Sequence, residues 1–167
     1  RRFVEHLERV NVYLNLLAST RYGRAIREAA ERDRELAALK KANGGRVPAN
    51  LPPFFGVPLM SKECYEMPGE SFTIGNWDHR ERFGKNTCPV LARLIRDGGV
   101  VVLGSGNVSE QCMWCESANV VHGVSRNVYH VGHSVGGSSG GTSAAVSALG
   151  APIALTSDVG GSIRIPA

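Results

Sequence analysis

The stretch "GGSSGGTSAAVSALGAPIALTSDVGGSIRIPA", residues 136–167, sets out the pattern on which the fold depends. A glycine-serine loop (136–141) leads into a helix of small residues (142–150), and a short apolar strand (152–157) precedes a second glycine loop. Glycine lets a backbone approach its neighbours closely or adopt conformations that other residues avoid. A succession of loop, helix, strand and loop is typical of α/β proteins, in which helices cover a largely parallel sheet.

The same alternation precedes this stretch. Residues 54–62 and 100–104 are apolar and bounded by Gly or Pro, which predicts two buried strands. Residues 85–99 between them predict a helix with Pro89 in its first turn and Gly98 at its end. We therefore predict an α/β fold with a mixed, largely parallel sheet.

The remaining segments complete the prediction. Apolar residues at helical spacing predict helix over 3–41, with a break near Tyr22 and Gly23. The Gly- and Pro-rich stretch 43–53 predicts a linker, so we expect a helical segment at 1–45 and the α/β part at 46–167. We also predict a short helix at 107–117 and a loop at 118–135.

Composition limits the function classes. The chain has 167 residues, 43% hydrophobic and 20% charged, as in a globular domain. The basic excess is confined to residues 1–46, where 11 Lys and Arg face 6 Asp and Glu, against 8 and 9 in the rest. This distribution is typical of a solvated helical face, and a patch for nucleic acid or an anionic membrane is the alternative.

Targeting signals are missing from the sequence as given. No apolar run reaches the roughly 18 residues of a membrane span, and no signal peptide is evident. We expect an intracellular or membrane-associated protein. Because the chain opens with Arg1, membrane association through a preceding segment stays open.

Four cysteines are present: Cys64, Cys88, Cys112 and Cys115. Cys112 and Cys115 have CxxC spacing, but a zinc site needs a second pair of ligands at similar spacing, which the other two do not provide. A redox CxxC follows a strand and opens a helix. We expect reduced thiols and no metal.

The terminal stretch "DVGGSIR", residues 158–164, contains a candidate nucleophile. Ser162 follows two glycines, and the consecutive backbone N–H groups of residues 159–162 can converge on one point because glycine removes the obstructing Cβ atoms. One such oxyanion donor stabilises a transition state by roughly 3–4 kcal/mol. The alternative is a plain glycine turn.

Two further features are candidates for chemistry. Lys62 ends an apolar strand; burial disfavours a charged lysine, and a neutral lysine is a competent base in serine–lysine pairs. The alternative is a solvated lysine at a strand end. The loop 136–141 lacks the lysine of a phosphate-binding loop, but at a helix N-terminus it is also compatible with an anion- or nucleotide-binding module.

Taken together, "GVPLMSKE" (56–63), "GGSSGG" (136–141) and "SDVGGSIRIPA" (157–167) resemble the amidase signature family of serine hydrolases. The stretches "NVSEQCMWCES" and "VGGSSGG" are most similar to its fatty-acid amide hydrolase branch, type 2. The resemblance runs from about residue 50 to 167. It implies that 46–167 is the N-terminal catalytic part of an α/β/α amidase-signature domain, incomplete at its C-terminus.

The resemblance implies a Ser-Ser-Lys triad. Ser162 would be the nucleophile that forms an acyl-enzyme with an amide substrate, and Ser138 would connect it to Lys62, the base. The family holds the bridging serine behind a cis peptide bond, which falls here between Gly137 and Ser138. No histidine, metal or cofactor takes part.

The resemblance also implies supporting residues. The N–H groups of Val159, Gly160, Gly161 and Ser162 would hold the oxyanion. Cys112 would line the substrate site, and Asp158 and Arg164 would hold the loop. The implied partner is a small-molecule or lipid amide rather than nucleic acid, and a homodimer stays open.

There are departures from the family pattern. Val128 and Val135 stand where many members have proline, which affects loop stiffness more than chemistry. Family domains run to several hundred residues, so the rest of the substrate pocket is expected outside this chain. An inactive fragment of an amidase is therefore a third interpretation, beside the active amidase and the anion-binding module.

Overall fold

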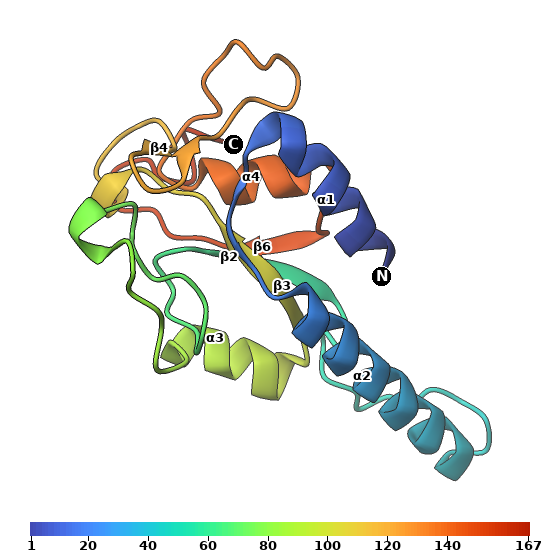
Figure 1. Ribbon diagram of the computed structural model, residues 1–167. Coiled ribbons are helices and arrows are strands. Elements are labelled where there is room, and N and C mark those ends of the chain that lie inside the picture. Colours follow the sequence, from blue (N-terminus) through green and yellow to red (C-terminus); the bar gives the residue numbers. More distant parts are fainter.

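The computed structural model describes residues 1–167 and contains a four-stranded sheet with helices on both faces (Figure 1). The strand order is β1 (Leu17–Thr20), β3 (Val101–Gly106), β2 (Pro58–Lys62) and β6 (Ile153–Leu155). The pairs β2–β3 and β2–β6 are parallel, and β1–β3 is antiparallel. The predicted α/β fold with a mixed, largely parallel sheet is confirmed.

Helices α1 (Arg2–Leu14) and α4 (Gly140–Ser147) cover one face of the sheet, and α3 (Pro89–Arg93) covers the other (Figure 1). A π-helical turn, Leu94–Gly98, continues α3. Alternate residues of β2 and β3 point to opposite faces, which gives the domain two apolar layers. The larger layer contains Val4, Leu7, Met60, Val101, Leu103 and Ala144, and the smaller one contains Leu59, Met67, Leu91, Val100 and Val102.

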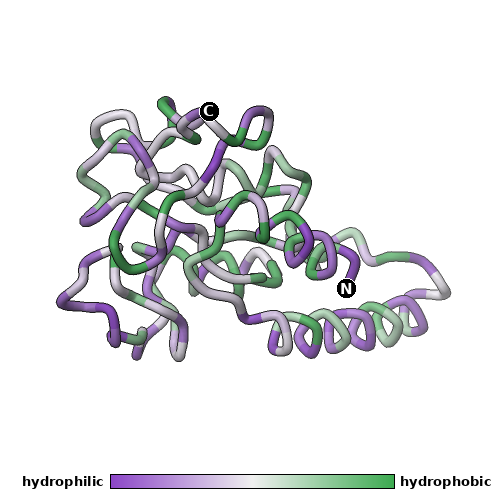
Figure 2. The backbone as a smooth tube through the Cα atoms, turned by 45° about the horizontal axis from the view of Figure 1, so that its top comes forward, coloured by the Kyte–Doolittle hydropathy of each residue, from purple (hydrophilic) through white to green (hydrophobic).

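Helix α2 (Tyr22–Ala42) extends beyond the sheet from its β1 edge (Figure 1). Hydrophilic and hydrophobic residues alternate along it (Figure 2), and Ala25 is its one buried residue. Arg21, just before the helix, is buried; its guanidinium donates to the carbonyl of Val102 at 2.7 Å and to Glu28 at 2.7 Å. This side chain fixes the start of α2 against β3.

None of the helices combines the length and the apolar character needed to cross a bilayer.

The N-terminal segment differs from its prediction, because a strand interrupts the helix expected over 3–41. Asn15 ends α1 in the left-handed conformation, with φ of 47°. The side chain of Asn11 then accepts from the N–H groups of Leu16 and Leu17, which turns the chain into β1. A short apolar run such as 16–18 fits a helix or a strand, and pairing with β3 decides between them. The division at residue 45 stays a prediction, although β1 belongs to the same sheet as β2.

The helix predicted at 107–117 is also wrong. The structure contains a single 3₁₀ turn, Glu110–Cys112, and Gln111 and Cys112 both have positive φ values, of 52° and 57°. The N–H of Gln111 donates to the carbonyl of Ile74 at 2.8 Å, a contact with another segment that a regular helix would not make. The predicted loop 118–135 contains two short strands, β4 (Ala118–Asn119) and β5 (Gly123–Val124).

Candidate active site

The candidate site lies at one edge of the parallel strands. Lys62 is the last residue of β2, Ser157 lies two residues beyond β6, and the segment with Cys112 follows β3. Neighbouring parallel strands bring their carboxyl ends to the same edge, where α/β proteins place their ligands. Ser138 lies two residues before α4, which packs over these strands. The fold thus brings together residues that are up to 100 positions apart in the sequence (Lys62 and Ser162).

Three side chains form a continuous line of close contacts. Nζ of Lys62 lies 2.8 Å from Oγ of Ser138, and this oxygen lies 2.9 Å from Oγ of Ser162. Lys62 and Ser138 are buried, whereas Ser162 is partly exposed. The line therefore connects a buried amine to a hydroxyl that a substrate can reach.

The amine of Lys62 is surrounded by hydroxyl and carbonyl oxygen atoms and by no carboxylate. The carbonyl oxygen and the hydroxyl of Ser157 each lie 3.3 Å from Nζ. No ion pair includes Lys62, and the adjacent carboxylate of Glu63 is directed to the backbone N–H groups of Thr73 and Ile74 instead. With Ser138, three acceptor atoms therefore surround the amine.

The backbone around Ser138 is closely packed. The peptide bond between Gly137 and Ser138 is cis, as the family resemblance predicts. A Cβ atom at Gly137 would lie 2.7 Å from the backbone nitrogen of Glu116, and one at Gly141 would overlap the backbone of Asn107. The glycine-serine loop is thus rich in glycine because two other backbone segments lie against it.

The loop after Ser157 is held by Asp158. Its carboxylate accepts hydrogen bonds from the N–H groups of Gly161 (2.9 Å), Ile163 (2.9 Å) and Arg164 (3.1 Å). The Arg164 guanidinium donates two further hydrogen bonds, at 2.9 and 3.2 Å. Arg164 and these backbone donors hold the pKa of the Asp158 carboxyl well below its usual range. The side chain thereby fixes the curvature of the segment that presents Ser162.

The N–H groups of this loop differ in their availability. Gly161 donates to Asp158, whereas the N–H groups of Val159, Gly160 and Ser162 have no acceptor within the chain. The Val159 side chain is 99% exposed, so the loop is open to solvent. Three of the four N–H groups expected from the sequence are free to bind a ligand, and the fourth is already hydrogen-bonded.

A cavity of about 520 Å³ lies over these groups. Its walls include Lys62, Ser162, Val159, Gly160 and Cys112, and the apolar side chains of Met113, Trp114 and Ile165. Cys112, for which the resemblance implies a place at the substrate site, lies in the wall of this cavity.

The Cys112 thiol has an unusual environment. Its pKa is lowered to about 7, chiefly because the neighbouring Cys64 thiol can donate to a Cys112 thiolate; the Ser138 hydroxyl contributes as well. The same interaction, together with burial, raises the pKa of Cys64.

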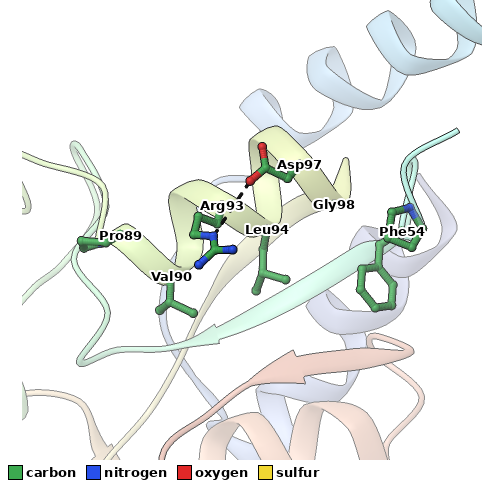
Figure 3. A pocket seen from close by; sticks show the side chains of 8 residues that line it. Phe54, Pro89, Val90, Arg93, Leu94, Asp97 and Gly98 are labelled. Atoms are coloured by element: carbon green, nitrogen blue, oxygen red, sulfur yellow. Dashed lines mark ion pairs between the residues drawn. The ribbon is translucent and has the colours of Figure 1, made fainter. Parts of the chain in front are cut away.

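A second cavity of similar size lies beside α3 (Figure 3). It is lined by Phe54, Pro89, Val90 and Leu94, and its charged side chains, Arg93 and Asp97, are exposed and pair with each other at 4.0 Å. It has no nucleophile and no hydrogen-bonded set of side chains comparable to the line from Lys62 to Ser162.

The N-terminus of α4 does not fit an anion site. The N–H groups of Ser139, Gly140 and Gly141 donate to Ser162, Ser117 and Asn107, respectively. These groups are therefore occupied by protein acceptors and buried. The geometry argues against the nucleotide- or anion-binding module.

Sequence reasoning missed two residues near the site. Ser157 contacts Lys62 through two oxygen atoms, and Glu63 fixes the loop 71–74. Their positions in the sequence could have indicated them, because Ser157 ends one predicted buried strand and Glu63 directly follows another.

Comparison with known proteins extends these observations. The model of the family described as "Amidase" matches residues 1–167. Fatty-acid amide hydrolase 2 of Homo sapiens is 38% identical over 165 residues, which cover 99% of this chain and 30% of that protein. Among solved structures, the peptide amidase of Stenotrophomonas maltophilia has a TM-score of 0.82 at 28% identity, covering 98% of this chain and 33% of the other. A 6-aminohexanoate cyclic dimer hydrolase has a TM-score of 0.81 at 27% identity, covering 99% of this chain and 31% of the other. The chain thus spans about a third of the length of the proteins that it matches.

Proposed function

Because the chain belongs to the amidase family, we propose that it carries the nucleophile, the proton relay and the oxyanion loop of an enzyme that hydrolyses carboxylic amides. Residues 46–167 would supply this catalytic part. The observation that carries the proposal is the line of contacts from Nζ of Lys62 through Ser138 to Ser162, at 2.8 and 2.9 Å. These distances are those of hydrogen bonds along which a proton can move.

The first half of the reaction forms an acyl-enzyme. Oγ of Ser162 attacks the amide carbonyl carbon while its proton passes to Ser138, whose own proton passes to the neutral amine of Lys62. The carbonyl oxygen becomes an oxyanion. When the tetrahedral intermediate collapses, a proton returns through Ser138 to the leaving nitrogen, and the amine departs.

The second half reverses these roles. Water attacks the acyl group on Ser162 and gives its proton to Lys62 through Ser138. Collapse of this intermediate restores the Ser162 hydroxyl and releases the carboxylic acid. No step requires a metal or a cofactor.

The surroundings of Lys62 support its role as base. The amine is buried and has no carboxylate partner. When it takes up the proton, the ammonium group has three donors, and three oxygen atoms of Ser138 and Ser157 lie within 3.3 Å. The charge that forms during the reaction therefore meets acceptors that are already in position.

The oxyanion would bind to the loop that precedes the nucleophile. The N–H groups of Val159, Gly160 and Ser162 have no acceptor in the chain and line or adjoin the cavity. Gly161 would join them by sharing its N–H with Asp158. Donors held in place before the reaction stabilise developing charge without reorganisation.

We propose a small-molecule or lipid amide, with fatty-acid amides as the leading class. The similarity to fatty-acid amide hydrolase 2 supports this class, and so do the apolar side chains of Met113, Trp114 and Ile165 at the cavity. An acyl chain needs such apolar walls.

Three single serine variants of the full-length protein test this proposal. Ser162→Ala should abolish both labelling by a fluorophosphonate and hydrolysis of a panel of short- and long-chain primary amides. Ser138→Ala should lower hydrolysis by about 10²–10⁴-fold. Ser139→Ala is the matched control, because the Ser139 hydroxyl contacts neither Lys62 nor Ser162, and its rate should stay within about tenfold of the wild type. Labelling that persists in Ser162→Ala, or equal losses in the two neighbouring variants, would contradict the proposal.

A further inference from the structure

Two thiols next to the triad have no part in the proposed reaction. Cys64 lies two residues beyond Lys62, and its sulfur is 4.0 Å from the Ser157 hydroxyl, which itself contacts Nζ of Lys62 at 3.3 Å. Cys112 lies in the wall of the catalytic cavity and interacts with Cys64. The segments that follow two adjacent parallel strands, β2 and β3, thus bring these thiols together at the site.

This pairing differs from the one that the sequence spacing indicates. Cys112 and Cys115 form a CxxC, but the neighbour with which Cys112 interacts is Cys64, which is 48 positions away, and Cys115 is exposed. The positive φ values at Gln111 and Cys112 form the tight turn that presents Cys112 at the cavity. The remaining cysteine, Cys88, packs in the apolar layer on the other face of the sheet.

The two thiols are chemically unequal, as a reactive pair requires. The Cys112 side chain lines the cavity, and the neighbouring Cys64 thiol lowers its pKa, which favours the thiolate. The Cys64 side chain is not part of the cavity lining, and its interaction with Cys112, together with burial, raises its pKa. A partly exposed thiolate beside a second thiol is the arrangement in which one sulfur reacts and the other resolves the product.

We propose that Cys112 and Cys64 form a peroxide-sensitive thiol pair whose oxidation to a disulfide closes the catalytic site. The Cys112 thiolate attacks one oxygen of hydrogen peroxide and breaks the O–O bond, which gives a sulfenic acid and, after protonation, water. The Cys64 sulfur then attacks the sulfenic sulfur, and its proton leaves with the hydroxyl group as a second water. Two thiols and one peroxide give one disulfide and two waters, and a dithiol reductant reverses the change by exchange.

The effect on catalysis rests on the proposed function. A disulfide brings its sulfur atoms to about 2.0 Å. Bonding would draw the turn at Gln111 and Cys112 toward the residue two positions after Lys62, and would remove the Cys64 contact from Ser157. The cavity wall and one of the residues around the base would change together, while Ser162 stays chemically intact.

The first test does not depend on enzyme activity. The purified full-length protein is treated with equimolar hydrogen peroxide, alkylated and digested with trypsin without reduction. Mass spectrometry should find the peptide of residues 63–80 linked to that of residues 97–126, with the loss of two hydrogen atoms. Cys115→Ser should retain this link, which assigns it to Cys112. Cys64→Ser should leave a Cys112 sulfenic acid that dimedone traps. Absence of the link, or its loss in Cys115→Ser, would overturn the proposal.

The second test measures closure of the site. Fluorophosphonate labelling of Ser162 should fall at least tenfold on oxidation and return with dithiothreitol, and Cys88→Ala should behave as the wild type does. If the link forms and labelling is unchanged, the thiol pair does not close the site. If the reduced protein is not labelled at Ser162, the proposed function fails instead, whereas the linked peptides still decide whether the thiols pair.

Discussion

The proposed relay from Ser162 to Lys62 makes a quantitative prediction about a double variant. Ser138 is the only connection between the two ends, with contacts of 2.9 and 2.8 Å, and Lys62 and Ser138 are both buried. If a proton must pass through both residues, removing either one interrupts the same path. The two substitutions should then be strongly non-additive.

The magnitude follows from the role of a general base. Such a group contributes about 10²–10⁴-fold, or roughly 3–5 kcal/mol of transition-state stabilisation at 1.36 kcal/mol per factor of ten. Lys62→Met, which keeps the aliphatic stem, and Ser138→Ala should each lose about this much in kcat/KM. The kcat/KM of the double variant should be at most about tenfold lower than that of the less active single variant. If the two residues contributed independently, their losses would multiply to about 10⁴–10⁸-fold.

The rate at which a fluorophosphonate phosphonylates Ser162, with loss of fluoride, is the suitable assay, because it reports the nucleophile without requiring the natural substrate. Thermal melts of the same three variants, followed by circular dichroism, establish that each is folded. A double-variant loss equal to the product of the single losses would refute the relay and leave Ser138 and Lys62 as separate contributors.

Three further expectations concern the framework of the site. Gly141→Ala should lower the free energy of unfolding by about 3 kcal/mol, because the new methyl group meets the backbone of Asn107. Gly160→Ala should change it by less than about 0.5 kcal/mol, because a Cβ atom there meets nothing within 4 Å. Urea unfolding measures both changes, and equal effects would contradict the packing argument. Glu63→Gln should lower the free energy of unfolding by about 2 kcal/mol. The buried carboxylate accepts four hydrogen bonds, and an amide nitrogen in place of one oxygen cannot accept the bond from the Ile74 N–H. An unchanged midpoint of urea unfolding would contradict this stabilising role of Glu63. Asp158 stabilises the loop as a carboxylate, and its pKa is depressed in the folded protein. Its contribution to the free energy of unfolding is therefore fully present above the pKa of the unfolded chain, about 3.9, and disappears only as pH falls through the lower pKa of the folded protein. An NMR titration of this carboxyl with a midpoint near 4 would contradict the depressed pKa.

The members of the line from Lys62 to Ser162 could be named from the sequence, Lys62 and Ser162 from their local patterns and Ser138 from the family resemblance. Lys62 ends an apolar strand, Ser138 lies between glycines that precede a helix, and Ser162 follows two glycines after another strand. These patterns report backbone demands, since glycine stands where a neighbouring segment leaves no room for a side chain. The long-range assembly then follows from parallel pairing of β2 with β6.

Other features depend on tertiary contacts that leave no local trace. Residues 17–20 become a strand only because β3 offers an edge, and Gln111 leaves the helical conformation only because its N–H reaches Ile74. The interaction of Cys112 with Cys64 is likewise invisible in the spacing, which points to Cys115. In each of these places the partner that decides the conformation lies more than 30 residues away.

The end of β2 illustrates how one strand can organise two parts of a site. Lys62 and Glu63 are adjacent and both buried, yet they serve different neighbours, as alternation along an extended chain requires. The amine of Lys62 meets Ser138, whereas the carboxylate of Glu63 binds the Ile74 N–H at 2.7 Å. The carbonyl of Ile74 in turn accepts from Gln111, which lies next to Cys112 in the cavity wall. Any displacement of this strand end therefore moves the Lys62 amine and the cavity wall together, which couples the contacts from Lys62 to Ser162 to the shape of the cavity.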